Sequence, residues 1–280
     1  MTTMGMDLTE QAEASAGASA EAVASAFVTA RRGARALDSY PGERPTDLAQ
    51  AYRIQDRAIT LDGRAIAGWK VGRINSPDDT RLGANRLAGP IFADSVVPAT
   101  PGDGPAMPVF VGGFAAAEAE LLLHLAPGWD GVPPADDAAT RALIDDVRLG
   151  IEIASSPYQG INADGPCVTA SDFGNNAGLV VGAALPGWAD LDLCAIVVRT
   201  EIDGELAGEA TAATMLDGPY GAVRFLLANL TARGFDLSAG LWVSTGAVTG
   251  VHQVTIGQRV TATFGAHGAV HCTIAAASGA

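Results

Sequence analysis

The sequence predicts an α+β protein in which helices are inserted into a β-rich core. Short apolar runs that alternate with polar residues, or that are rich in Val, Ile and Leu, recur from residue 66 onward and are typical of strands. Helical spacing of apolar residues is confined to a few segments. Strands and helices do not alternate as in a βαβ fold, and the sequence contains no internal repeat.

The composition narrows the class of protein further. The chain has 280 residues, enough for one large domain or two small ones, and its 48% hydrophobic content supports a sizeable core and excludes wholesale disorder. The formal net charge of −14 argues against nucleic acid as a partner, because phosphate binding needs clustered Lys and Arg. A small anionic substrate stays compatible, since a metal ion and a few basic groups set the local potential.

The cysteines and apolar runs indicate a compartment. Cys167, Cys194 and Cys272 are widely spaced, and an odd number without a C-x-x-C pair fits no disulfide framework. No run approaches the roughly 20 apolar residues of a membrane span, and the N-terminus lacks the pattern of a signal peptide. We therefore expect a cytoplasmic protein that does not bind a membrane.

We expect three parts along the chain. Residues 1–20 are rich in Ala, Ser, Gly and Glu and are predicted to be a flexible tail. Residues 21–98 form a helical and mixed N-terminal segment, and residues 99–280 form the main β-rich catalytic domain. Within the N-terminal segment, apolar residues at helical spacing predict helices over 20–35 and 48–61, the second capped by Thr46 or Asp47.

A short strand with a lysine follows these helices. Residues 68–73 read Gly-Trp-Lys-Val-Gly-Arg. A lysine in such a run either points to solvent or lines a cleft, where the flanking glycines let a substrate approach the backbone. Residues 75–90 are predicted to be mainly loop, 91–97 a strand and 100–108 a linker.

Two glutamates one residue apart mark the next strand. Glu118 and Glu120 lie in the apolar run 113–125, and side chains at i and i+2 of a strand share a face. They are either solvated surface charges or ligands of a cation, because neither is easily buried as an unpartnered ion. Glu152, between two isoleucines in a predicted strand over 147–154, supplies a third carboxylate.

The remaining elements are predicted as follows. Residues 133–144 contain a short helix, and 162–178 are a polar connection. An amphipathic helix ends at Gly234. Strands are expected at 179–182, at 194–202 and 205–210 around an Asp-Gly turn, at 241–246, and at 254–256, 258–264 and 269–274.

Three glutamates without a His or Cys cluster favour a hard cation. Carboxylate oxygens suit Mg²⁺, Mn²⁺ or Ca²⁺ better than Zn²⁺. A site built from Glu118, Glu120 and Glu152 would keep positions open for a bidentate ligand such as the carboxylate and keto oxygens of a 2-oxo acid. The metal would then act as a Lewis acid and stabilise an enolate.

The order of four motifs resembles a known family. These are Gly68-Trp69-Lys70-Val71-Gly72, Ala117-Glu118-Ala119-Glu120, Gly150-Ile151-Glu152-Ile153 and Ser171-Asp172-Phe173-Gly174-Asn175-Asn176-Ala177-Gly178. They are similar to motifs of the fumarylacetoacetate hydrolase superfamily, in its 2-keto-4-pentenoate hydratase / 4-oxalocrotonate decarboxylase branch. The resemblance runs from about residue 51 to residue 274.

The resemblance implies a fold, a cofactor and roles for residues. The fold would be a mixed β-roll or β-sandwich with a small helical N-terminal segment, in a homo-oligomer. The glutamate triad would hold Mg²⁺ or Mn²⁺, Lys70 would polarise the substrate's oxyanion, and Asp172 or a metal-bound water would handle protons. The substrate-binding positions implied are Asn175, Asn176, Thr245 and Gly246.

One loop departs from the family pattern. Typical hydratases carry an acidic loop after the lysine, whereas the corresponding stretch here, 83–90, has Asn85, Arg86 and Ala88 at the acidic positions. An acid or base that this loop supplies in relatives is therefore absent here at those positions.

The reaction implied first is hydration of a 2-oxo-4-enoate through an enolate stabilised by the metal, which is the chemistry of a hydro-lyase. Alternatives within the superfamily are decarboxylation of a 2-oxo diacid and C–C hydrolysis of an acylpyruvate. A different alternative is a non-catalytic subunit that keeps the fold, because some enzymes of this branch work in a complex with another pathway enzyme.

Overall fold

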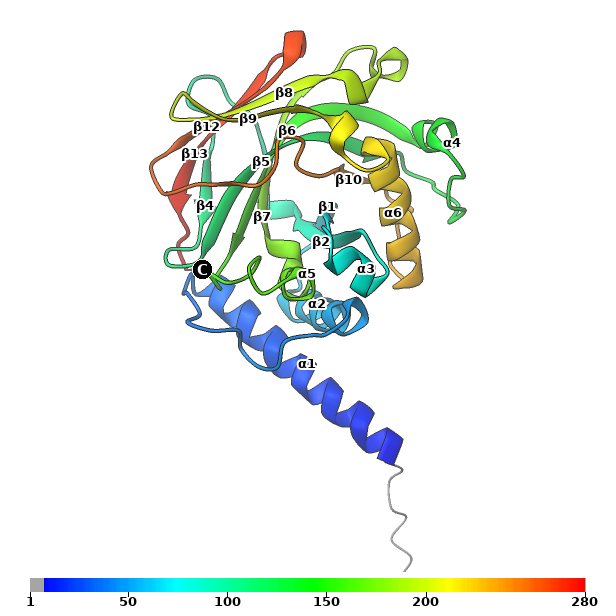
Figure 1. Cartoon of the computed structure of the whole chain (residues 1–280), viewed down its shortest axis with the longest axis vertical. Helices are drawn as coiled ribbons and strands as arrows, with labels where there is room; N and C mark the ends of the chain where they lie inside the picture. Colours follow the sequence, from blue (N-terminus) through cyan, green and yellow to red (C-terminus); the bar gives the residue numbers. More distant parts are fainter. Residues whose placement is uncertain (1–7, 280) are drawn as a thin grey trace, which may run out of the picture.

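The computed structural model describes residues 8–279 and builds its core from two curled sheets, with most of the helices gathered at one end (Figure 1). The larger sheet has eight strands, seven of them in one path with β11 paired to the side of β5. Its strands in spatial order are β2 (Arg86–Phe92), β1 (Ile66–Arg73), β10 (Leu241–Ser244), β5 (Phe114–Leu125), β6 (Ile144–Ser156), β7 (Asn176–Ala184) and β3 (Val96–Pro98), with β11 (His252–Gln253) beside β5.

The smaller sheet has five strands and packs its apolar face against the larger one. Its order is β4 (Ala106–Val109), β13 (Ala269–Ala276), β12 (Arg259–Phe264), β8 (Val197–Ile202) and β9 (Glu205–Thr211). Leu121 and Leu149 from the larger sheet share one hydrophobic cluster with Val260, Phe264 and Val270 from the smaller one. The predicted α+β class, with its β-roll or sandwich core, is confirmed.

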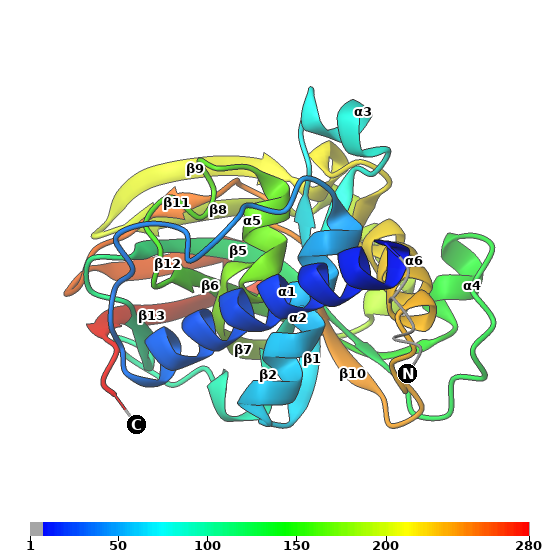
Figure 2. The same ribbon diagram turned by 90° about the horizontal axis from the view of Figure 1, so that it is seen from below.

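Of the six α-helices that the structure describes, three have 15 residues or more and three have only five or six. They are α1 (Leu8–Arg32), α2 (Leu48–Asp62), α3 (Asp78–Leu82), α4 (Asp137–Arg141), α5 (Pro166–Ser171) and α6 (Gly218–Ala232). Asp47 caps α2 by accepting a hydrogen bond from the Gln50 amide, as predicted. Figure 2 shows α1 and α2 lying across the same side of the molecule. None of the described helices is long and apolar enough to cross a membrane.

The expected flexible tail over 1–20 differs from the structure. Residues 1–7 lie outside the described residues, but α1 already begins at Leu8, and its first half projects beyond the body of the molecule (Figure 1). Ala, Glu and Gln dominate this stretch and are strong helix formers, so the absence of large apolar residues did not prevent a helix. Strands β1, β2 and β3 join the same sheet as β5 and β6, so a boundary after residue 98 would pass through that sheet.

Other element boundaries also moved. The strand predicted over 91–97 is two strands, β2 and β3, separated by a 3₁₀ turn over Ala93–Ser95. The sequence hid the start of β2 because Pro90 and Gly89 resemble a loop. Within the described residues β2 pairs only with β1, and an edge strand tolerates proline. The helix predicted over 133–144 is reduced to α4, and the polar stretch 162–178 contains α5.

Candidate metal centre

The three predicted carboxylates converge on two neighbouring strands of the larger sheet. Glu118 and Glu120 project from β5, and Glu152 projects from β6 directly opposite Glu118 in the antiparallel ladder. Each offers an oxygen that lies within 4.8 Å of the others, and all three residues are buried. Like charges placed opposite each other destabilise a sheet, so this arrangement needs a compensating cation.

Two of the carboxylate oxygens have no hydrogen-bond partner among the residues that the structure describes. Glu120 Oε1 and Glu152 Oε2 are buried and accept no hydrogen bond, although such oxygens are nearly always paired. Oxygens that share one ion at about 2.0–2.6 Å lie no more than about 5 Å apart, and one oxygen from each of the three glutamates meets this limit. The hard oxygen donors and the orphaned atoms therefore fit a divalent cation such as Mg²⁺, Mn²⁺ or Ca²⁺.

The electrostatics of the isolated chain point to the same need. Burial, together with the charge of Glu152, raises the pKa of Glu118 to about 7, although Lys70 acts in the opposite direction. Burial and the two neighbouring carboxylates also raise the pKa of Glu120 well above its ordinary value. Without a cation, protons are drawn to carboxylates that a metal ion would otherwise bind.

Lys70 lies beside the triad and is the only lysine in a sequence with 17 Lys and Arg residues. Its Nζ lies 3.3 Å from Glu152 Oε1 and donates to Asn175 Oδ1 at 3.2 Å. Burial alone would lower the pKa of Lys70, but the charges of Glu152, Glu118 and Glu120 outweigh it and raise that pKa. The ammonium is therefore a fixed positive charge, and of the two alternatives for this lysine the buried position beside a cleft is the one found.

A left-handed turn brings Asn175 to Lys70. Phe173, Gly174 and Asn175 have φ values of 55°, 60° and 58°, and such a run is rare for residues with a side chain. The turn passes so close to β2 that a Cβ on Gly89 would lie 2.1 Å from the Phe173 carbonyl oxygen. Glycine at position 89 thus permits the approach that places the Asn175 amide against Lys70.

The far side of Glu120 is held by the end of β10. Glu120 Oε2 accepts hydrogen bonds from the Ser244 hydroxyl and, at 2.9 Å, from the Gly246 amide. Thr245 donates its hydroxyl to the Leu121 carbonyl at 2.8 Å. Thr245 and Gly246 line the cavity as expected of substrate-binding residues, but their donors serve the protein, and Gly246 orients a candidate metal ligand.

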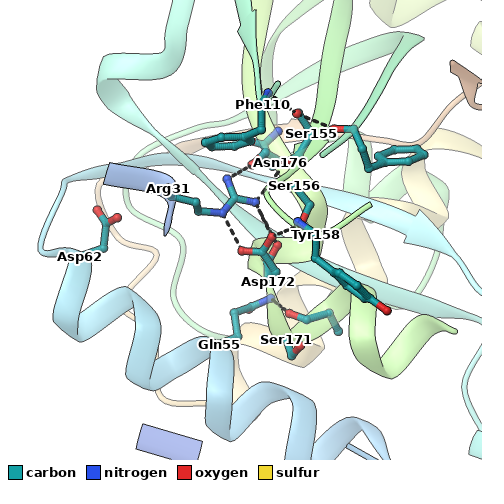
Figure 3. Close-up of polar contacts among 12 residues, drawn as sticks. Arg31, Gln55, Asp62, Phe110, Ser155, Ser156, Tyr158, Ser171, Asp172 and Asn176 are labelled. Carbon is teal, nitrogen blue, oxygen red and sulfur yellow. Dashed lines mark hydrogen bonds and ion pairs between the residues drawn. The ribbon is translucent and has the colours of Figure 1, made fainter. Parts of the chain in front are cut away.

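Asp172 lies elsewhere, in a saturated ion pair. Its two carboxylate oxygens accept from Arg31 at 2.6 and 2.9 Å and from the Ser156 hydroxyl at 2.6 Å (Figure 3). Arg31 also donates to the carbonyls of Ser155 and Asn176. Asp172 is fully buried and is not among the residues that line the main cavity. The structure therefore does not place this predicted proton-handling residue with Lys70 and the triad.

Asn176 acts between these two groups. Its side-chain amide donates to Glu152 Oε1 at 2.9 Å, while its carbonyl accepts from Arg31 at 3.0 Å. It does not line the main cavity, so its contacts orient a candidate metal ligand rather than reach a substrate. Asn175, in contrast, lines the cavity as predicted.

A cavity of about 730 Å³ opens beside Lys70 and Glu118. Its polar lining near the triad includes Asn162, whose Oδ1 accepts from Asn175 Nδ2 at 2.9 Å. Further out it is bounded by Arg73 and Arg86 and by apolar residues, among them Ile74, Leu87, Met215, Leu216 and Val251.

Sequence reasoning missed several residues of this centre. Arg31 lies within the helix predicted over 20–35 and gave no signal of its own in the sequence, yet it holds Asp172, 141 residues away. Asn162 and Gly89 carried no local signal, because an asparagine and a glycine in polar stretches are ordinary loop residues.

These observations define the class: a β-rich α+β protein with a candidate divalent-metal centre of three buried glutamates and one buried lysine, beside a large cavity.

Comparison with known proteins finds partial similarity to curated relatives. No family model matches the chain. The chain is 28% identical over 129 residues to 4-oxalocrotonate decarboxylase from Pseudomonas putida, a match that covers 46% of this chain and 48% of the relative. The chain therefore spans about half the length of the curated relatives that it matches.

Solved structures extend the likeness over nearly the whole fold. 4-Oxalocrotonate decarboxylase from Pseudomonas putida, complexed with calcium and acetate, matches 92% of this chain and 97% of its own with a TM-score of 0.74 and 21% identity. Fumarylpyruvate hydrolase from Pseudomonas aeruginosa, in complex with Mn²⁺ and pyruvate, matches 76% of this chain and 91% of its own with a TM-score of 0.54 and 16% identity. The chain therefore shares the fold of these proteins, which is the fumarylacetoacetate hydrolase type that the sequence resemblance implied.

Proposed function

We propose that the protein is a divalent-metal-dependent enzyme that acts on a small 2-oxo acid by way of its enolate. The observation that carries this proposal is the pair of buried, unpartnered oxygens on Glu120 and Glu152, in a triad whose carboxylates converge to within 4.8 Å beside a cavity. Relatives named for 2-oxo acid chemistry, solved with Ca²⁺, Mg²⁺ or Mn²⁺, support it.

Each part of the site has a separate task in this proposal. Glu118, Glu120 and Glu152 would hold Mg²⁺ or Mn²⁺, and a bound divalent cation supplies a Lewis acid that favours negative charge on the 2-oxo oxygen. Lys70, held by Glu152 and Asn175, places a fixed positive charge where that negative charge develops. Because the lysine is already positioned before substrate binds, its stabilisation requires little reorganisation.

Decarboxylation of a 2-oxo diacid is the reaction that this site supports best. The bond to the distal carboxylate breaks, its electron pair moves through the conjugated chain to the 2-oxo oxygen, carbon dioxide leaves, and that oxygen takes up a proton to give the dienol. This step needs an electron sink more than a base. Among the described residues that line the cavity, the carboxylates are Glu118, a candidate metal ligand, and Asp78, which is paired with Arg81.

Hydration of a 2-oxo-4-enoate is the second candidate. It uses the same enolate but also requires a group that delivers water oxygen to one alkene carbon and a proton to its neighbour. Asp172 was the predicted group, and its carboxylate is already saturated by Arg31 and Ser156. A hydratase would therefore have to take its protons from water or from Lys70.

The test is product analysis with a metal-stripped protein. After Mg²⁺ or Mn²⁺ is added back, we expect 2-oxohex-3-enedioate to release carbon dioxide and form 2-hydroxypenta-2,4-dienoate. NMR monitors both compounds. Consumption of 2-hydroxypenta-2,4-dienoate instead would favour hydration. Metal binding without turnover of either compound would support the non-catalytic subunit. Failure to bind any divalent cation would overturn the proposal.

A further inference from the structure

The outer end of the cavity carries positive charge that the metal centre does not use. Arg73 and Arg86 face each other across the β1–β2 ladder, and both line the cavity. Like charges at opposed positions of a sheet are unfavourable unless an anion lies between or beside them. In a chain of net charge −14, a cationic cavity wall is a local exception.

Arg86 is the more informative of the two. It is only 7% exposed, and one nitrogen, Nη2, contacts a protein carboxylate, that of Asp217. No protein acceptor among the described residues meets its other guanidinium N–H groups, although a buried guanidinium normally has several partners. These free donors belong to a side chain that borders the cavity, so they are available to a ligand there.

The counter-ion of Arg86 is shared and half exposed. Asp217 is also bound by Arg224 Nη2 at 3.1 Å through its second oxygen. Arg224 also pairs with Asp137, so two carboxylates serve Arg86 and Arg224. Arg73 adds a third cation, and among the described residues its guanidinium donates only to the Thr214 carbonyl. The cluster keeps a positive excess that a ligand carboxylate would neutralise.

The spacing suits a substrate anchored at both ends. In the β1–β2 ladder Lys70 pairs with Gly89, whereas Arg73 pairs with Arg86. Arg86 is thus three residues, or about 10 Å, further along the hairpin than the position opposite Lys70. The wall between them includes Leu87 and Met215, which suit an alkyl or alkenyl chain.

We propose that Arg86, with Arg73 beside it, forms a distal anion subsite that binds a second carboxylate of the substrate. This inference rests on the proposed function, because the 2-oxo end must lie at the metal centre for the second carboxylate to reach Arg86. The subsite selects 2-oxo diacids over 2-oxo monoacids. Since the guanidinium holds the carboxylate in the bound substrate, its contribution is to binding and orientation rather than to bond cleavage.

Two unreactive probes of equal chain length test the subsite. 2-Oxoadipate and 2-oxohexanoate share the 2-oxo acid and differ in a terminal carboxylate against a methyl group. We expect calorimetric titration with Mg²⁺ present to show that the wild-type protein prefers 2-oxoadipate by about tenfold or more, as a charge-assisted contact predicts. Arg86→Met should bring the preference to within about twofold and leave 2-oxohexanoate binding unchanged.

Two further variants complete the design. Asp217→Asn frees Arg86 from its counter-ion and should strengthen binding of 2-oxoadipate alone. It also serves as the test if Arg86→Met does not fold. Arg259→Met, which removes an arginine paired with Asp103 on the smaller sheet, is the matched control and should keep the wild-type preference.

The outcomes separate the two proposals. Equal binding of both probes to the wild-type protein, or loss of 2-oxoadipate binding in Asp217→Asn, would overturn the subsite and leave the metal centre intact. Failure of both probes to bind in the presence of Mg²⁺ would overturn the proposed function and the subsite together.

Discussion

Two buried acidic sites, the glutamate triad on β5 and β6 and Asp172 in the turn after α5, differ in how their oxygens are satisfied. Asp172 accepts from Arg31 and Ser156 on both oxygens and carries no excess charge. The triad has three carboxylates against one ammonium and leaves two buried oxygens without a donor. Burial and charge alone therefore do not distinguish a functional site from a structural ion pair. Buried carboxylate oxygens that lack donors and lie beside a cavity do.

The largest effect is expected from removing a triad carboxylate. Glu152→Gln should abolish tight binding of Mg²⁺ or Mn²⁺ by calorimetry and lower kcat/KM by about 10³-fold or more, because Lewis-acid stabilisation is worth several kcal/mol. It should leave the metal-free protein at least as stable, since it relieves repulsion with Glu118. Glu205→Gln, at an exposed position, is the control. Retention of wild-type metal affinity in Glu152→Gln would contradict the comparison.

Breaking the saturated pair should act on stability instead. Asp172→Asn leaves the Arg31 guanidinium buried without a counter-ion, and we expect the free energy of unfolding in urea to fall by about 3–5 kcal/mol. Metal affinity should change little. The same substitution in the exposed Asp103–Arg259 pair should cost no more than about 1 kcal/mol. A folded Asp172→Asn protein of normal stability that has lost activity would return Asp172 to a catalytic role.

Lys70 offers a third distinction, between holding the metal and using it. Lys70→Met removes the one cation that competes with a metal for the triad, so metal affinity should stay equal or rise. Turnover should fall by about 10²-fold or more, as for other preorganised charges in closed sites. Parallel calorimetry and steady-state kinetics measure the two effects. Equal loss of both would show that the lysine merely supports the fold around Glu152 and Asn175.

The smallest expected effect is a pH dependence of metal stabilisation. Burial raises the pKa of Glu118 from an ordinary 4.5 to about 7, so the metal-free folded protein binds more protons than the unfolded chain between these values. The contribution of Glu118 to the free energy of unfolding of the metal-free protein is therefore lost as pH rises through about 7. The increase in Tm on adding Mg²⁺ should therefore be larger near pH 8 than near pH 5.5. Each kcal/mol by which Mg²⁺ raises the free energy of unfolding more at pH 8 should add about 2–4 °C to that increase. A shift independent of pH would contradict this account of the triad.

The sequence predicted the triad better than its surroundings, for a physical reason. Glu118, Glu120 and Glu152 are set by strand parity and by a register of two adjacent strands, which short-range patterns encode. The approach of Arg31 to Asp172 depends on how α1 crosses the sheet, and nothing within either segment specifies that crossing. Likewise, the left-handed turn at Asn175 depends on a contact with Gly89 that only the folded chain brings about.

The predicted boundaries of helices and strands were wrong for a similar reason. Pro90 reads as a loop residue until its place in an edge strand is known, and the weakly apolar start of α1 reads as a tail until helix propensity is weighed above hydrophobicity. The role proposed for Arg86 illustrates the same point. In the sequence Arg86 is noticed only because it replaces an acidic residue of the family's loop, whereas in the folded chain it is a cation bordering the cavity.

The single lysine has a consequence for how the protein can be observed. Apart from the terminal amine, all amine chemistry of this chain is confined to one buried position beside the candidate metal centre. An amine-specific label can reach Lys70 only when the surrounding structure opens, so the labelling rate measures how often the structure opens locally at that position. If a divalent cation slows the labelling of Lys70, the slower rate would show that the cation closes the site, and no substrate needs to be known for this measurement.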